Sequence, residues 1–205
     1  MANLKQQYQK NFGSYAIPET LEKLMVFDSK HELDSCADSF CLCTEIDKTP
    51  DLGQYSLDDE YFERLLIFAN ADGSGSKYCF WVNEPGIELE NAPIVVIGSE
   101  GDFYITSKNL KELICQLSFG PEHSGGSWWR EVDVVDEDDE YEFPENSDEF
   151  RDWMKKELNI TPVEDRDDEF CDTADGLAEK AKAKYGEAFK KWMLSLTPQY
   201  APYED

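Results

Sequence analysis

Basic residues are scarce in this chain of 205 amino acids, in which 19 Lys and Arg stand against 45 Asp and Glu for a formal net charge of −26. A nucleic-acid binder neutralises phosphate with positive charge, so this balance argues against a nucleic-acid partner. Attraction to an anionic membrane surface would also need basic residues. A basic protein is the electrostatic complement of such a chain, although acidity also serves solubility alone.

Long apolar runs are also missing, and the first residues, MANLKQQYQKNFG, hold neither an apolar stretch nor a small-residue cleavage site. We therefore expect no secretory signal and no transmembrane helix. Histidine occurs only at His31 and His123, and both are expected to be solvated rather than general bases. The six cysteines lack zinc-type spacing, since Cys41 and Cys43 are one residue apart. Their apolar surroundings favour reduced, buried thiols in a cytoplasm over a disulfide framework.

A folded core is expected nevertheless, because 40% of the residues are hydrophobic and 13% are aromatic. Runs of apolar, aromatic and β-branched residues predict strands, with turn residues between them. The predicted strands are 65–69, 77–82, 93–97 and 102–106, with a further short strand within 39–46.

Two helices flank these strands in the sequence. Pro18 marks the start of the first, whose apolar face contains Ile17, Leu21, Leu24 and Met25. Ser107 is predicted to cap the second, which Gly120 would end. The apolar stripe of this second helix consists of Leu110, Leu113, Ile114 and Leu117. The order helix, strands, helix predicts an α+β domain over residues 15–119.

The composition changes in residues 120–205, which we expect to be an acidic, mainly helical extension packed on the core. Residues 131–150 include eleven acidic residues and no Lys or Arg. A strand is predicted at 128–135, and helices are predicted from Ser147 and over 173–196. Apolar residues on one face of the last helix are Leu177, Ala181, Tyr185, Phe189, Trp192 and Leu196. Lysines are frequent in this helix, so the acidic segment has two possible targets, its own chain or a partner.

The loop at residues 70–76, NADGSGS, has the composition of a ligand-binding loop. An EF-hand calcium loop starting here would need Glu at its twelfth position, where Trp81 stands. A phosphate-binding P-loop would precede a helix, whereas this loop precedes a predicted strand. We therefore predict a strand-to-strand turn with Asp72, Gly73 and Gly75 as its structural residues, because glycine permits positive φ and Asp accepts hydrogen bonds from the local backbone.

No arrangement of residues predicts catalysis. The sequence GSEG at 98–101 lacks the preceding glycine that a nucleophile elbow needs. The acidic run 136–140 contains oxygen ligands for a divalent cation, but such runs usually form a solvated face. We therefore expect no enzymatic activity, no metal and no cofactor.

The order of these motifs resembles the SUKH superfamily, which groups bacterial immunity proteins with fungal regulators of cell-wall glucan synthesis. The resemblance rests on a Pro-initiated helix, LLIFANADGSG, KYCFWV, PIVVIGSEGDFYIT and the helix SKNLKELICQL, and covers residues 15–119. It implies a mixed central β-sheet flanked by helices, and no catalysis. Residues from Gly120 onward match no pattern of this superfamily.

The resemblance also implies a function. Bacterial members of the superfamily lie in the cytoplasm and block a cognate polymorphic toxin, often a nuclease, by binding it. An acidic protein can occupy the basic phosphate path of a nuclease, so the expected partner is a basic toxin. The alternative is a regulatory scaffold that binds one of the cell's own proteins, as the fungal members are thought to do.

The acidic segment of the extension is the predicted contact surface for the toxin. Tyr141, Trp128 and Trp129 are candidate aromatic anchors, since Trp and Tyr are frequent in binding hot spots. For the two tryptophans a place in the core is the favoured interpretation, whereas the acidic residues are equally compatible with a contact surface and with a solvated loop. The acidic candidates are Asp136, Glu137, Asp138, Asp139, Glu140 and Glu142.

Overall fold

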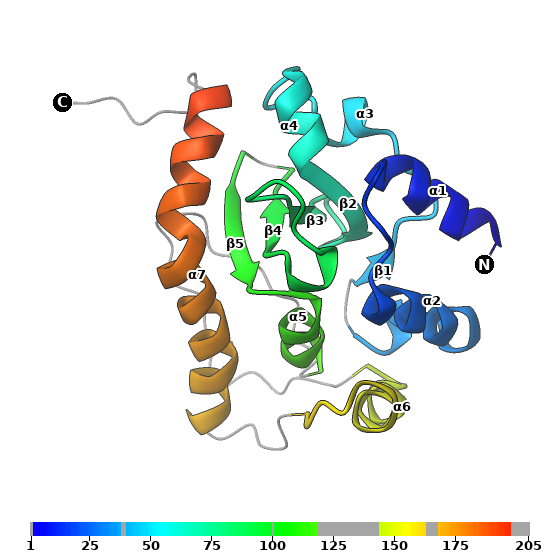
Figure 1. Cartoon of the computed structure of the whole chain (residues 1–205). Coiled ribbons are helices and arrows are strands. Elements are labelled where there is room, and N and C mark those ends of the chain that lie inside the picture. The colour runs from blue at the N-terminus through cyan, green and yellow to red at the C-terminus, as the bar shows by residue number, and fades with distance from the viewer. Residues whose placement is uncertain (1, 38–39, 100, 119–143, 163–167, 198–205) are drawn as a thin grey trace.

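A computed structural model describes residues 2–37, 40–99, 101–118, 144–162 and 168–197 (Figure 1). The α-helices are α1 (Ala2–Phe12), α2 (Glu19–His31), α3 (Lys48–Leu52), α4 (Asp59–Arg64), α5 (Leu110–Leu117), α6 (Ser147–Trp153) and α7 (Asp168–Leu196). Short 3-10 helices lie at Leu33–Ser35 and Leu89–Asn91, and a π-helical turn, Met154–Leu158, follows α6. The strands are β1 (Cys41–Leu42), β2 (Leu65–Asn70), β3 (Lys77–Trp81), β4 (Ile94–Ile97) and β5 (Phe103–Ser107).

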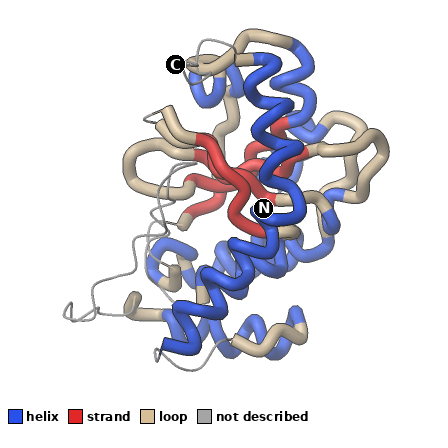
Figure 2. Tube along the Cα trace, turned by 90° about the vertical axis from the view of Figure 1, so that its left-hand side faces the viewer, coloured by secondary structure: helices blue, strands red, loops and turns tan. Residues whose placement is uncertain are grey.

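The fold class is α+β, as predicted, with one five-stranded sheet in the order β1-β2-β3-β4-β5. Each pair of neighbours in this sheet is antiparallel, which differs from the mixed sheet that the family resemblance implies. The connections from β2 to β3 and from β4 to β5 are too short for the helical crossover that parallel neighbours need. Figure 2 shows the strands at the centre of the molecule, with helices around them.

Alternate residues of β3 and β4 belong to two different hydrophobic clusters, one on each face of the sheet, and β2 follows the same pattern up to its bulge at Ala69. In β3, Tyr78 and Phe80 belong to the first cluster, whereas Cys79 and Trp81 belong to the second. Both faces are therefore buried, which explains why the strands are almost continuously apolar in sequence.

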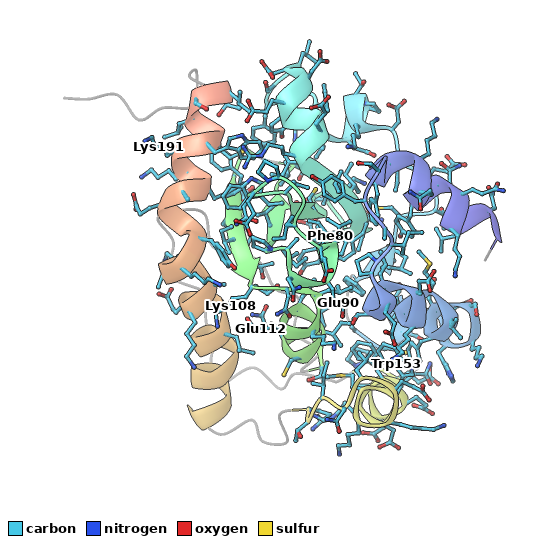
Figure 3. The ribbon with its side chains drawn as sticks, in the orientation of Figure 1. Phe80, Glu90, Lys108, Glu112, Trp153 and Lys191 are labelled. Carbon is cyan, nitrogen blue, oxygen red and sulfur yellow. The ribbon has the colours of Figure 1, made fainter. Side chains whose placement is uncertain are left out.

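Helices cover both clusters. The first cluster receives Tyr8 and Phe12 of α1, residues of α2 and α5, and Phe150 of α6. Figure 3 shows Phe80 on this side of the sheet and Trp153 between α6 and α2. The second cluster receives Tyr61 of α4 and Phe189 of α7. The hydrophobic core thus extends beyond residues 15–119 in both directions along the chain.

Several predicted boundaries differ from the structure. Asn109, not Ser107, caps α5, because its side chain accepts a hydrogen bond from the backbone N–H of Glu112 (3.0 Å) while Ser107 is still in β5. The strand predicted within 39–46 has two residues, and the last helix begins five residues before the predicted start. Helix α1 was not predicted, since its stretch is mostly polar.

Candidate functional site

The predicted contact surface lies outside the described residues. This applies to Trp128, Trp129, Tyr141 and the acidic residues Asp136, Glu137, Asp138, Asp139, Glu140 and Glu142. The predicted strand at 128–135 and His123 lie outside them as well. The role of this segment therefore stays a prediction.

The loop at 70–76 joins β2 to β3, as a turn. Asp72 Oδ1 accepts hydrogen bonds from the backbone N–H groups of Ser74 (2.8 Å), Gly75 (3.0 Å) and Ser76 (3.0 Å). Burial alone would raise the pKa of Asp72, but the hydrogen bonds from Ser76 and Ser74 outweigh it and hold the pKa below its usual value. Gly75 has a φ of +108°, whereas Gly73 does not adopt positive φ. One oxygen of the Asp72 carboxylate thus closes the turn.

The remaining candidates for chemistry are also structural. His31 is half-buried at the end of α2 and stacks on Phe27 with ring centroids 4.6 Å apart, so it is less solvated than predicted. Burial raises the pKa of the Cys43 thiol to about 12 and raises that of Cys79 further, so both stay protonated at neutral pH. Across the described residues, no group of three or more His, Cys, Asp or Glu side chains is placed to hold a metal ion.

An acidic edge that the sequence did not single out is formed by α4 and the residue before it. We define this acidic edge as Leu57, Asp58, Asp59 and Glu63, all of which are exposed. Leu57 is 72% exposed, the largest exposure of a bulky hydrophobic side chain in the described part of the molecule. The three carboxylates form no salt bridge with any other described residue. An apolar side chain is therefore presented next to carboxylates that form no salt bridge within the described residues.

Local sequence explains the shape of this edge. Asp58 caps α4, since its Oδ1 accepts a hydrogen bond from the backbone N–H of Glu60 (2.8 Å). Asp59 and Glu63 are four residues apart in the helix and so lie on the same face. Tyr61 faces inward and is fully buried, which holds α4 against β2 with its acidic face outward. A cap followed by Asp-Glu is visible in the sequence, but the exposure of Leu57 is not.

Two described basic residues near the edge, Arg64 and Lys48, donate hydrogen bonds to backbone carbonyls. Arg64 donates from Nε to the Val82 carbonyl (2.7 Å), and its guanidinium lies 4.8 Å from the Trp192 ring centroid. Lys48 donates to the Phe62 carbonyl, and burial lowers the pKa of its ammonium group to about 8. Neither cation forms a salt bridge with the exposed carboxylates of the acidic edge, although Glu63 interacts electrostatically with Lys48 and raises the pKa of its ammonium group.

A pocket of about 780 Å³ opens beside the acidic edge, and its lining comes from the end of α1, helix α4 and the residues that follow β3. Asp59 and Glu63 belong to both the edge and the pocket lining. Lys48 lines the pocket too.

The chain matches no protein-family model, no curated protein and no solved structure. In the described residues, no helix has both the length and the apolar character needed to cross a membrane.

Proposed function

We propose that this protein binds and neutralises a basic protein, as a non-catalytic immunity protein does with its cognate bacterial toxin. The observation that carries the proposal is the acidic edge, where Leu57 is exposed among three carboxylates that form no salt bridge within the described residues. Protein interfaces usually have an apolar centre that loses its water on binding and a polar or charged rim around it. The motif order of residues 15–119, which resembles the SUKH superfamily, supports the same function.

The net charge of −26 supports this proposal through kinetics as well as affinity. Opposite charge on two proteins steers their encounter and raises the association rate. A nuclease toxin is basic where it holds phosphate, and an acidic surface can occupy that path. The acidic segment at 136–142 contributes six carboxylates to this net charge.

The first experiment is capture of partners on the immobilised protein from lysates of its own and of rival strains, with identification by mass spectrometry. We expect a stoichiometric, basic toxin fragment that high salt releases. Capture of a resident signalling or wall-synthesis protein instead would support the regulatory scaffold. Retention of no protein would contradict both.

A matched pair of triple variants then places the surface. Asp58→Asn/Asp59→Asn/Glu63→Gln neutralises the acidic edge and keeps the helix cap, because Asn caps as well as Asp. Asp148→Asn/Glu149→Gln/Asp152→Asn removes three exposed charges from α6 and serves as the control with the same net charge. We expect at least tenfold weaker toxin binding for the first variant only. An equal loss in both would mean that total charge, rather than this edge, drives binding.

A further inference from the structure

Lys48 is the first residue of α3 and belongs to the lining of the pocket beside α4. It is half-buried, and its Nζ donates a hydrogen bond to the Phe62 carbonyl. A carbonyl is a neutral acceptor, so it satisfies one N–H group without balancing the positive charge of an ammonium group. Lys48 therefore loses hydration without gaining a salt bridge from this contact.

Other half-buried lysines in the described part of the chain are paired with carboxylates. Lys77 forms a salt bridge with Asp51 (3.6 Å), and Lys108 forms one with Glu112 (3.5 Å). Within the same residues Lys48 forms no salt bridge. Removal of the positive charge would therefore cost Lys48 less than it would cost these two lysines.

The unprotonated amine is the form of lysine that acts as a nucleophile. Burial lowers the pKa of the Lys48 ammonium group to about 8, although Cys79 and Glu63 act in the opposite direction. At neutral pH about one Lys48 side chain in ten is then unprotonated, against fewer than about one in a thousand for a lysine with the ordinary pKa. The amine of Lys48 is thus far more available for reaction than that of an exposed lysine.

The pocket beside Lys48, of about 780 Å³, has room for a small reagent and favours an uncharged one. Asp59, Glu60 and Glu63 line it and would repel an anionic reagent such as an acyl phosphate. Arg64 is the other cation of the lining, and it donates to Glu60 (3.0 Å) and to two backbone carbonyls. An uncharged reagent meets no such repulsion.

From this arrangement we infer that Lys48 is an acylation site, which a small uncharged thioester modifies from the pocket. The lone pair of Nζ forms a bond to the thioester carbonyl carbon, the carbon–sulfur bond breaks, and the thiol leaves with the proton that the nitrogen gives up. The product is a neutral amide, so the cost of burying a charge disappears. Its single N–H group still has the Phe62 carbonyl as an acceptor.

The test uses S-acetyl-N-acetylcysteamine, an uncharged acetyl thioester, with the full-length protein at neutral pH. Peptide mass spectrometry measures the rate of acetylation at each lysine. We expect Lys48 to react at least tenfold faster than Lys191, which is exposed, and than Lys77, which is salt-bridged. With acetyl phosphate, which is anionic, this advantage should be smaller, and an equal advantage would contradict the choice of an uncharged donor.

The dependence of the rates on pH separates an unprotonated amine from one that is merely accessible. The rate at Lys48 should level off above about pH 8, whereas the rate at Lys191 should continue to rise up to about pH 10. Rates that rise in parallel over this range, or acetylation of Lys48 that is no faster than that of Lys191, would overturn the inference.

Variants test the role of the neighbouring charge. Glu63→Gln removes a carboxylate that stabilises the Lys48 ammonium group, so it should raise the rate at Lys48 at neutral pH at least twofold. Glu149→Gln removes an exposed carboxylate from α6 and is the matched control, which should leave the rate unchanged. Lys48→Arg should abolish the fast reaction and leave the rate at Lys191 as it is. A fast reaction that persists in Lys48→Arg would assign it to another residue.

Discussion

Asp72 shows how one side chain closes a turn that resembles a ligand loop in sequence. Its Oδ1 accepts hydrogen bonds from three backbone N–H groups and from the Ser74 hydroxyl (2.8 Å). This oxygen is therefore occupied by the turn itself. Asp72→Ala should lower the free energy of unfolding by about 2 kcal/mol at neutral pH, the usual size for hydrogen bonds to a charged group. Urea denaturation measures this loss.

The effect of Asp72 on stability should depend on pH. Because its folded pKa is held below the ordinary value of 3.8, its contribution is complete above that value and is lost as pH falls through the lower, folded pKa. The difference between wild type and Asp72→Ala should therefore shrink in acid. Asp72→Asn keeps an acceptor oxygen, so its free energy of unfolding at neutral pH should lie between those of wild type and Asp72→Ala. A difference that stays constant down to strongly acidic pH would contradict this account.

Lys48 is the second residue whose ionisation reports its surroundings. Burial lowers its pKa from 10.5 to about 8, although Cys79 and Glu63 act in the opposite direction. Between these two pH values the unfolded chain binds more protons than the folded one, so Lys48 makes stability rise with pH. Relative to Lys48→Met, wild type should gain at most about 3 kcal/mol across that window, at about 1.4 kcal/mol per pKa unit.

Denaturation of the two proteins at several pH values measures this gain. The variant has no ionisable group at this position, so the difference in slope between the two proteins reports the proton binding of Lys48 alone. Parallel curves for wild type and Lys48→Met would show that the ammonium group is solvated.

At the scale of elements, α7 is the part of the extension that completes the core. Phe189 lies 5.0 Å from the Trp81 ring and 6.2 Å from the Phe103 ring, measured between centroids. It is fully buried, whereas Lys191 is exposed and points away from the sheet (Figure 3). The helix therefore covers the second face of the sheet and excludes water from β3 and β5.

Phe189→Ala should destabilise the whole molecule by about 3–5 kcal/mol, the usual cost of removing a buried aromatic ring. Lys191→Ala is the matched control on the same helix and should change stability by less than about 0.5 kcal/mol. Circular dichroism and tryptophan fluorescence should report one shared unfolding transition. Separate transitions for helix and sheet would show that α7 is not an integral part of the core.

At the scale of the whole molecule, charge should govern how fast a partner is found. Replacing Asp136 to Glu140 with Asn and Gln should slow association with the captured toxin by about tenfold at low salt, since steering acts on the encounter rate. Stopped-flow mixing at two ionic strengths measures this effect. Association rates that do not change at low salt would limit the segment to a solvated face or to contacts within its own chain.

Local patterns predicted much of the fold correctly. The strands β2 to β5 were found because their residues are apolar on both faces, and α2 and α5 because their apolar stripes recur at helical spacing. Helix α1 was not predicted, because its two buried aromatic residues, Tyr8 and Phe12, lie among polar residues in the sequence. The candidate site was not predicted for a similar reason. The sequence shows the charges of Asp58 and Asp59, but it does not show that these residues lie beside a pocket.

The amino-acid sequence by itself determined the charge, the main strands and helices and the turn at Asp72, because each depends on residues that are close together in the chain. Only the tertiary structure decided that α1, α6 and α7 share the core with the sheet. It also decided that Leu57 is exposed at an acidic edge and that Asn11 and Asn83 line the same pocket. These features join residues that are far apart in the chain. Such features depend on which apolar surfaces of distant segments are buried against each other. No local sequence pattern specifies that pairing.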